Sequence, residues 1–372
     1  MIQDPFLDTY VDVDEHTFLG SAFDLKKYHY SGIWITVFSD FKNSGFPLFA
    51  AINGTIYKTI DLSPYWGVLF LKLNVAFVGC FVPGVVYLLC CRLSENYGKS
   101  FTASIAYGTL SVVLFYSVGL MRDIHIALIY AIGIYIITGN GVSIKKYIIL
   151  MILGVAAYFI RIENGLFFLA FIAAWSIQSG GKYKIAMIFF AILCLAYLIY
   201  WIGGISTIID TATATADIYQ GRAGVYANTG SLGMKLNKLP IPFNYLAKSA
   251  FGQIDPFPFW ARMVKQQTVV RKLFFVPEAV AGLFWFYVWL RLLFNFRRTI
   301  AFFARYKYAF GLALLYIIMV SVGQANPRRL MAVYPMIYLC FFYIDNRVFR
   351  LKEILYAIGL YVLLLAVYFV IK

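Results

Sequence analysis

Ten apolar runs dominate the sequence, and polar connections of only a few residues separate most of them. Hydrophobic residues make up 62% of the 372 residues, and charged residues only 13%. A soluble domain has roughly 45–50% apolar and about 25% charged residues, so a soluble core would not bury this many apolar side chains. Disorder is excluded as well, because disordered chains have low hydrophobicity. The sequence therefore predicts a polytopic membrane protein.

The fold class expected from these runs is all-α, a bundle of about ten transmembrane helices. Several runs are shorter than the roughly 20 residues that a spanning helix needs. Aromatic and lysine side chains at their ends are tolerated at the membrane interface and complete the span. Residues 147–177 also fit a re-entrant pair. The ten predicted segments are 66–91, 102–120, 124–138, 147–160, 165–177, 185–203, 276–295, 308–322, 330–344 and 354–371.

The basic residues predict the orientation of this bundle. The net charge is +15, but the charges lie between apolar runs and form no basic patch on a soluble fold, so nucleic acid is not an expected partner. Every second connection is rich in lysine and arginine, and such connections face the cytoplasm. The basic set is Arg92, Lys99, Lys145, Lys146, Lys182, Lys184, Arg297, Arg298, Arg305, Lys307, Arg347, Arg350 and Lys352.

The chain is expected to have four parts. The 72 residues from 204 to 275 are too many for a simple connector, so they predict a lid or a substrate-binding segment. Residues 235–248 and 257–272 are expected to form short amphipathic helices along the interface. The parts are a first extracytoplasmic loop with an acidic motif (1–65), six membrane helices (66–203), a long extracytoplasmic loop (204–275) and four C-terminal membrane helices (276–372).

The cysteines and histidines indicate no metal or redox site, and the N-terminus indicates no signal peptide. The five cysteines lie inside apolar runs without metal or redox spacing and are expected to be buried hydrophobes. The three histidines also lack a metal-ligand spacing. The first 30 residues contain acidic residues and no apolar signal-peptide core, so the first membrane segment is the expected insertion signal. A glycosylation sequon at Asn53 is interpreted as a chance match.

Charged residues gather in the predicted extracytoplasmic connections. Three of these connections are short hairpins, so their charges lie at the membrane edge, where a charge is usually paired or functional. Arginine presents a planar fork of donors that suits phosphate oxygens. Arginines from three hairpins at one depth therefore predict an anionic ligand, such as a lipid-linked phosphate or pyrophosphate. The residues are Asp14, Glu15, Arg122, Asp123, Arg161, Glu163, Arg328 and Arg329.

These residue types suit glycosyl transfer from a polyprenyl phospho-sugar. The candidate catalytic residues are Asp14 and Glu15, because an acidic group acts as general base on an acceptor hydroxyl. The four arginines would bind the donor phosphate and stabilise the charge that develops on it, with Asp123 and Glu163 in support. Ordinary alternatives stay open: surface charge in the first loop, ion pairs within the hairpins, and nonspecific lipid binding by the last arginines.

Short motifs along most of the chain resemble the GT-C superfamily of integral membrane glycosyltransferases, particularly bacterial protein mannosyltransferases and the aminoarabinose transferase. The resemblance implies a GT-C fold, a polyprenyl-phosphate-linked donor and an active site on the extracytoplasmic side of the bacterial inner membrane. It also implies that Asp14 is the base with Glu15 close by, and that the four arginines are donor-phosphate candidates. The motifs are residues 13–19, 46–48 with 62–65, 115–123, Arg161 with Asn164 and Gly165, and 328–330 with Tyr334 and Pro335.

The sequence departs from that family at its start and leaves several functions open. The family has a transmembrane helix before the acidic loop, whereas only thirteen residues precede Asp14 here. Either the start lies upstream or that helix is lacking, and in the second case an incomplete site and an inactive relative are among the alternatives. The alternatives are a polysaccharide polymerase or ligase, a lipid-linked oligosaccharide flippase or transporter, and a non-catalytic partner protein. A divalent cation at Asp14 or Glu15, the sugar, the acceptor and the oligomeric state are left open.

Overall fold

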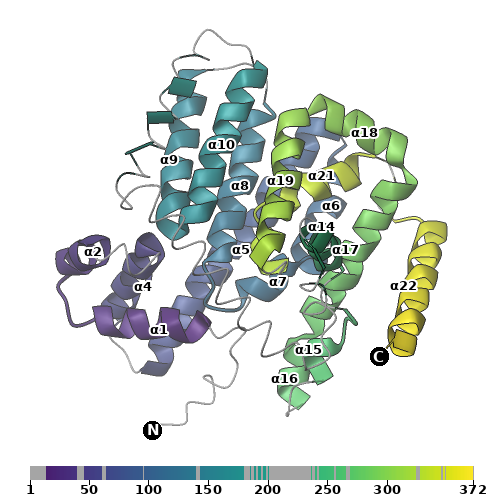
Figure 1. Cartoon of the computed structure of the whole chain (residues 1–372). Helices are drawn as coiled ribbons and strands as arrows, with labels where there is room; N and C mark the ends of the chain where they lie inside the picture. The colour runs from purple at the N-terminus through teal and green to yellow at the C-terminus, as the bar shows by residue number, and fades with distance from the viewer. Residues whose placement is uncertain are drawn as a thin grey trace.

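The computed structural model of the chain describes most of its residues, and the secondary-structure elements of that part are all α-helices. Figure 1 shows them packed as a bundle, with the first helices of the chain at one end. The all-α prediction is confirmed for this part. The described residues are 14–39, 46–60, 64–94, 96–139, 143–179, single positions between 185 and 200, and 236–371 with gaps at 237–238, 241–242, 255–256, 265–268, 324–326, 345–346 and 348.

Among the residues that the structure describes, three helices are long and apolar enough to cross a membrane, which supports the membrane class. They are α5 (Pro64–Ser94), α17 (Val276–Phe294) and α22 (Leu351–Ile371). The 31 residues of α5 extend for about 46 Å, which exceeds the hydrocarbon thickness of a bilayer. Shorter helices accompany them: α8 (Asp123–Ile137), α9 (Ile144–Ile160), α10 (Ile162–Ser179) and α19 (Lys307–Gly323).

Two predicted segments are interrupted in the structure. Segment 102–120 is divided at Ser111 into α6 (Tyr97–Leu110) and α7 (Val112–Ser117). The Ser111 hydroxyl accepts a hydrogen bond from the Val113 N–H at 3.2 Å, so it caps the second helix. Segment 330–344 likewise consists of the end of α20 (Pro327–Leu330) and α21 (Tyr334–Tyr343). The predicted segment 185–203 lies largely outside the described residues.

The predicted first loop is a layer of helices. It contains α1 (Asp14–Leu25), α2 (Tyr30–Ser39) and α4 (Pro47–Ile60), which lie together at one end of the bundle in Figure 1. Phe18 packs edge-on against Phe49, with ring centroids 5.1 Å apart. The sequon residue Asn53 is buried within α4.

Part of the predicted long loop also forms helices. These are α14 (Phe243–Gly252), α15 (Ala261–Val264) and α16 (Val269–Phe274). Helix α15 lies within the region 257–272, whereas α14 and α16 overlap the two predicted regions and extend beyond their ends. Helix α14 packs against α19. Just after α14, the Gln253 side-chain oxygen accepts hydrogen bonds from the indoles of Trp285 and Trp289, both at 3.2 Å. These contacts join this part of the loop to α17. Residues 201–235 lie outside the described part.

Helices α9 and α10 form a tight hairpin that positions Arg161 between them. A Cβ atom at Gly165 would lie 2.2 Å from the Tyr158 Cα atom, which is far inside van der Waals contact. We expect Gly165→Ala to lower the free energy of unfolding by about 1–3 kcal/mol or more, because backbone must move to admit the methyl group. Gly311→Ala is the matched control, since a Cβ atom there meets nothing within 4 Å. Denaturation in detergent measures both, and equal stabilities would contradict this packing.

Candidate functional site

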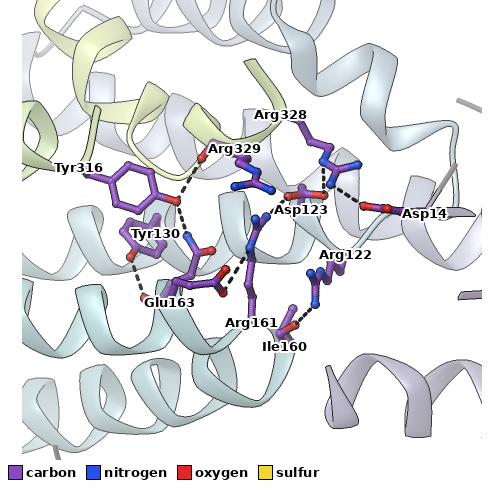
Figure 2. A network of polar contacts seen from close by, with 11 residues as sticks. Asp14, Arg122, Asp123, Tyr130, Ile160, Arg161, Glu163, Tyr316, Arg328 and Arg329 are labelled. Carbon is purple, nitrogen blue, oxygen red and sulfur yellow. Dashed lines mark hydrogen bonds and ion pairs between the residues drawn. The ribbon is translucent and has the colours of Figure 1, made fainter. Parts of the chain in front are cut away.

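Charged residues from four separate parts of the chain meet at the end of the bundle that carries α1. Figure 2 shows Asp14 at the start of α1, Arg122 and Asp123 at the start of α8, Arg161 between α9 and α10, and Arg328 in α20. The short turns explain this arrangement, because each places its charge directly at a helix end. The structure therefore brings together residues that are up to 314 positions apart in the sequence.

Asp123 lies at the centre of this cluster, between two buried arginines. Only 3% of Asp123 is exposed. Its Oδ1 atom accepts a hydrogen bond from Arg161 Nη1 at 2.7 Å, and its Oδ2 atom lies 3.4 Å from Arg328 Nε. Burial by itself would lower the pKa of Arg161, but the charges of Asp123 and Glu163 raise it overall. One carboxylate thus holds two guanidinium groups in fixed positions.

Asp14 is the accessible acid that contacts Arg328. Its Oδ2 atom lies 2.6 Å from Arg328 Nη2, and 45% of its side chain is exposed. Arg328 therefore contacts two carboxylates, the buried Asp123 and the accessible Asp14. A molecule that approaches from solvent or from the lipid headgroups reaches Asp14 before it reaches Asp123.

Arg122 lies close to this cluster on an aromatic platform. Its guanidinium is 5.6 Å from the ring centroid of Phe18 and 5.4 Å from that of Phe46, and Nη1 donates to the Ile160 carbonyl at 3.4 Å. Burial and the charge of Arg161 lower the pKa of Arg122 to about 10. The side chain is therefore still a cation at neutral pH.

Glu15 has an anchoring position, unlike its neighbour Asp14. It is 1% exposed, and its Oε1 atom accepts a hydrogen bond from the Leu120 N–H at 2.7 Å and lies 3.0 Å from Lys72 Nζ. These contacts tie α1 to α5 and to the turn that precedes Arg122. A catalytic role for Glu15 beside Asp14 stays a prediction. Its burial and its partners suit a residue that positions the site.

A second set of polar contacts supports the turn that carries Arg329. Tyr316 donates a hydrogen bond to the Arg329 carbonyl at 3.1 Å and accepts one from Asn164 Nδ2 at 2.8 Å. The Tyr130 hydroxyl, with Tyr130 labelled at the left of Figure 2, donates to the Asn164 carbonyl at 2.8 Å. Glu163 lies at the edge, 3.6 Å from Arg161 Nε, with 70% of its side chain exposed.

The sequence alone did not indicate Lys72, Tyr130 or Tyr316. Lys72 lies inside the first apolar run, and the two tyrosines lie inside later runs. Aromatic residues in such runs are normally assigned to the hydrophobic core. The signal available for Lys72 was its charge within a membrane segment, which is costly unless it is paired. The tyrosines have no such signal, because only the packing of α8, α10 and α19 brings them to Asn164.

Metal ligation finds no further support in the structure. Among the residues that the structure describes, no group of three or more histidine, cysteine, aspartate or glutamate side chains is arranged to hold a metal ion. His125 instead packs edge-on against Phe49, with ring centroids 5.3 Å apart. A divalent cation between Asp14 or Glu15 and a phosphate stays an open alternative.

The chain was also compared with known proteins. No family model, no curated protein and no solved structure matches it.

Proposed function

We propose that the protein is a membrane glycosyltransferase with a GT-C type bundle of about ten membrane segments. It moves a sugar from a polyprenyl-phosphate-linked donor to a glycan, lipid or protein acceptor on the extracytoplasmic face of the bacterial inner membrane. The observation that carries the proposal is the contact of the accessible Asp14 with Arg328, beside the buried Asp123–Arg161 pair. An accessible base and fixed guanidinium groups are the two requirements of this reaction.

In the proposed reaction, Asp14 accepts the proton of the acceptor hydroxyl. At the same time the oxygen of that hydroxyl attacks the anomeric carbon of the donor sugar. The bond between that carbon and the phosphate oxygen breaks, and the electron pair stays on the phosphate. The products are the glycosylated acceptor and the polyprenyl phosphate, and the proton rests on Asp14. Arginines stabilise the negative charge that gathers on the leaving phosphate.

Donor binding would also release the base. Arg328 is shared between Asp14 and Asp123, and a donor phosphate competes with Asp14 for it because phosphate accepts the guanidinium fork through two oxygens. Asp123 is buried and keeps Arg328 in place during the exchange. Asp14, once displaced from Arg328, would turn its carboxylate to the acceptor hydroxyl. If the donor binds first, Asp14 accepts a proton from the acceptor only when the donor is present.

The charges at the two ends of the bundle support the proposed orientation. The end with Asp14 and Asp123 combines acidic and basic side chains in ion pairs. The end with α18 (Phe296–Arg305) carries exposed arginines and lysines. An excess of basic residues marks the cytoplasmic side of a membrane protein, so the acidic and basic cluster would face outward, at the depth of a lipid phosphate.

The test is an assay of the full chain, purified and placed in lipid nanodiscs, with polyprenyl-phosphate-linked hexoses and pentoses as donors. Release of polyprenyl phosphate in the presence of acceptor glycans, lipids or peptides is the expected result. Arg122→Ala should raise the donor KM by roughly 10- to 100-fold, because a hydrogen bond to a charged group contributes about 1.5–3 kcal/mol. Arg122→Lys keeps the charge and serves as the control. Absence of release with every donor would sink the proposal.

A further inference from the structure

Helix α18 lies at the end of the bundle opposite to α1, where it crosses between α17 and α19 (Figure 1). Its sequence, FRRTIAFFAR, mixes basic and apolar residues. Thr299 and Phe302 are buried against the bundle, whereas Phe296, Arg297 and Ile300 are exposed. A short helix that exposes both arginine and large apolar side chains is typical of the membrane interface.

Two distant basic segments are fixed together at this end. Arg298 Nη1 donates a hydrogen bond to the Ile344 carbonyl at 3.0 Å, which ties α18 to the connection after α21. The fully buried Arg291 donates to the Arg347 carbonyl and lies 3.5 Å from Glu353. We call the exposed cations that result the basic belt: Arg297, Arg298, Arg305, Lys307, Arg347, Arg350 and Lys352.

The acidic charge beside this belt is small in the described part of the chain. Glu353 lies there with 13% of its side chain exposed, between Arg291 and Arg350, whose Nη1 atom is 3.9 Å away. The belt thus has seven exposed cations, whereas the Glu353 carboxylate is mostly covered. The belt has a large local excess of positive charge and suits an anionic partner.

Exposed apolar side chains lie directly next to the belt. Leu293 and Phe294 end α17, and Leu351 and Leu355 begin α22, and all four are exposed. The Phe294 and Tyr356 rings approach to 6.0 Å, so the two helices are neighbours there. Because α17 and α22 are both long and apolar enough to cross a membrane, these side chains would meet acyl chains where the cations meet headgroups.

We propose that the basic belt binds anionic phospholipids of one leaflet, with the phosphate on the arginines and the acyl chains against the ends of α17 and α22. The exposed apolar side chains favour a lipid over a soluble polyanion as the partner, because a soluble polyanion would leave these side chains in water. Arginine suits this role, since its fork binds phosphate through two hydrogen bonds. The inference is independent of the proposed sugar transfer.

Native mass spectrometry of the full chain from nanodiscs with equal phosphatidylglycerol and phosphatidylcholine tests this. The wild type should retain phosphatidylglycerol in preference. Each removed cation should weaken retention roughly fivefold, so the triple variant Arg297→Gln, Arg347→Gln, Lys352→Gln should weaken it roughly a hundredfold. The charge-keeping triple variant Arg297→Lys, Arg347→Lys, Lys352→Arg should retain the lipid.

Three results would overturn the inference. They are equal retention of both lipids by the wild type, unchanged retention by the glutamine variant, and displacement of the lipid by millimolar glycerol phosphate, which has the headgroup charge but no acyl chains. Thermal unfolding shows whether the triple glutamine variant is folded. If it is not, Arg297→Gln alone decides, because this exposed side chain can be replaced without removing a buried contact.

Discussion

Asp14→Asn is expected to lower sugar transfer by roughly 10²- to 10⁴-fold, the usual contribution of a general base. Asparagine has nearly the same shape but does not accept a proton at neutral pH. Donor binding should persist, because Arg122, Arg161 and Arg328 are still present. Asp14 is about half exposed, so the fold should tolerate the change. The measurements are the rate of polyprenyl phosphate release and the binding of the donor to the same preparation.

Asp24→Asn is the matched control for this prediction. Asp24 lies on the same helix, α1, and its side chain is exposed. It should transfer sugar at the wild-type rate, so a specific effect of Asp14 is separated from a general effect of charge on α1. Wild-type transfer by Asp14→Asn would remove the assigned base, whereas loss of activity in both variants would point to the helix as a whole.

Asp123→Ala is expected to lower the free energy of unfolding by about 3–5 kcal/mol, because it leaves buried charge without its partner. Arg161 and Arg328 both contact the Asp123 carboxylate, at 2.7 and 3.4 Å. Both arginines are buried, so neither guanidinium is able to reach solvent unless a helix end moves. Thermal or denaturant unfolding of the purified chain in detergent measures the loss.

Glu163→Gln gives the comparison for an exposed partner of the same arginine. Its carboxylate lies 3.6 Å from Arg161 Nε, but 70% of the side chain is exposed. An exposed ion pair contributes about 0–1 kcal/mol, so this variant should unfold close to the wild type. A larger loss for Glu163→Gln than for Asp123→Ala would show that the buried carboxylate is not the centre of the cluster.

The positions of many helices follow from the apolar runs, but the breaks within them do not. The predicted segments 124–138, 147–160 and 276–295 lie close to α8, α9 and α17. Apolar residues continue on both sides of Ser111, so periodicity gives no reason for a new helix there. The break depends on a local hydrogen bond, in which the serine hydroxyl caps the backbone of the following turn.

The charged residues of the site were identifiable, whereas their pairing was not. The sequence suggests Arg161 with Glu163, because they are neighbours. The structure gives Arg161 a shorter contact with Asp123, which is 38 residues away. Likewise Asp14 and Glu15 look equivalent in the sequence, but they point to different surroundings. Such choices depend on helix rotation and packing, which a list of charges does not contain.

The contact between Asp14 and Arg328 also has a consequence for biosynthesis. The ribosome must add 314 residues after Asp14 before its partner exists, which takes roughly 15 to 60 s at 5–20 residues per second. Lys72, the partner of Glu15, emerges much sooner. During that interval Glu15 of α1 can already pair with Lys72 of α5, whereas Arg328 has not yet been synthesised. A nascent chain that stops before the last hairpin therefore has Asp14 but lacks the arginine that pairs with it.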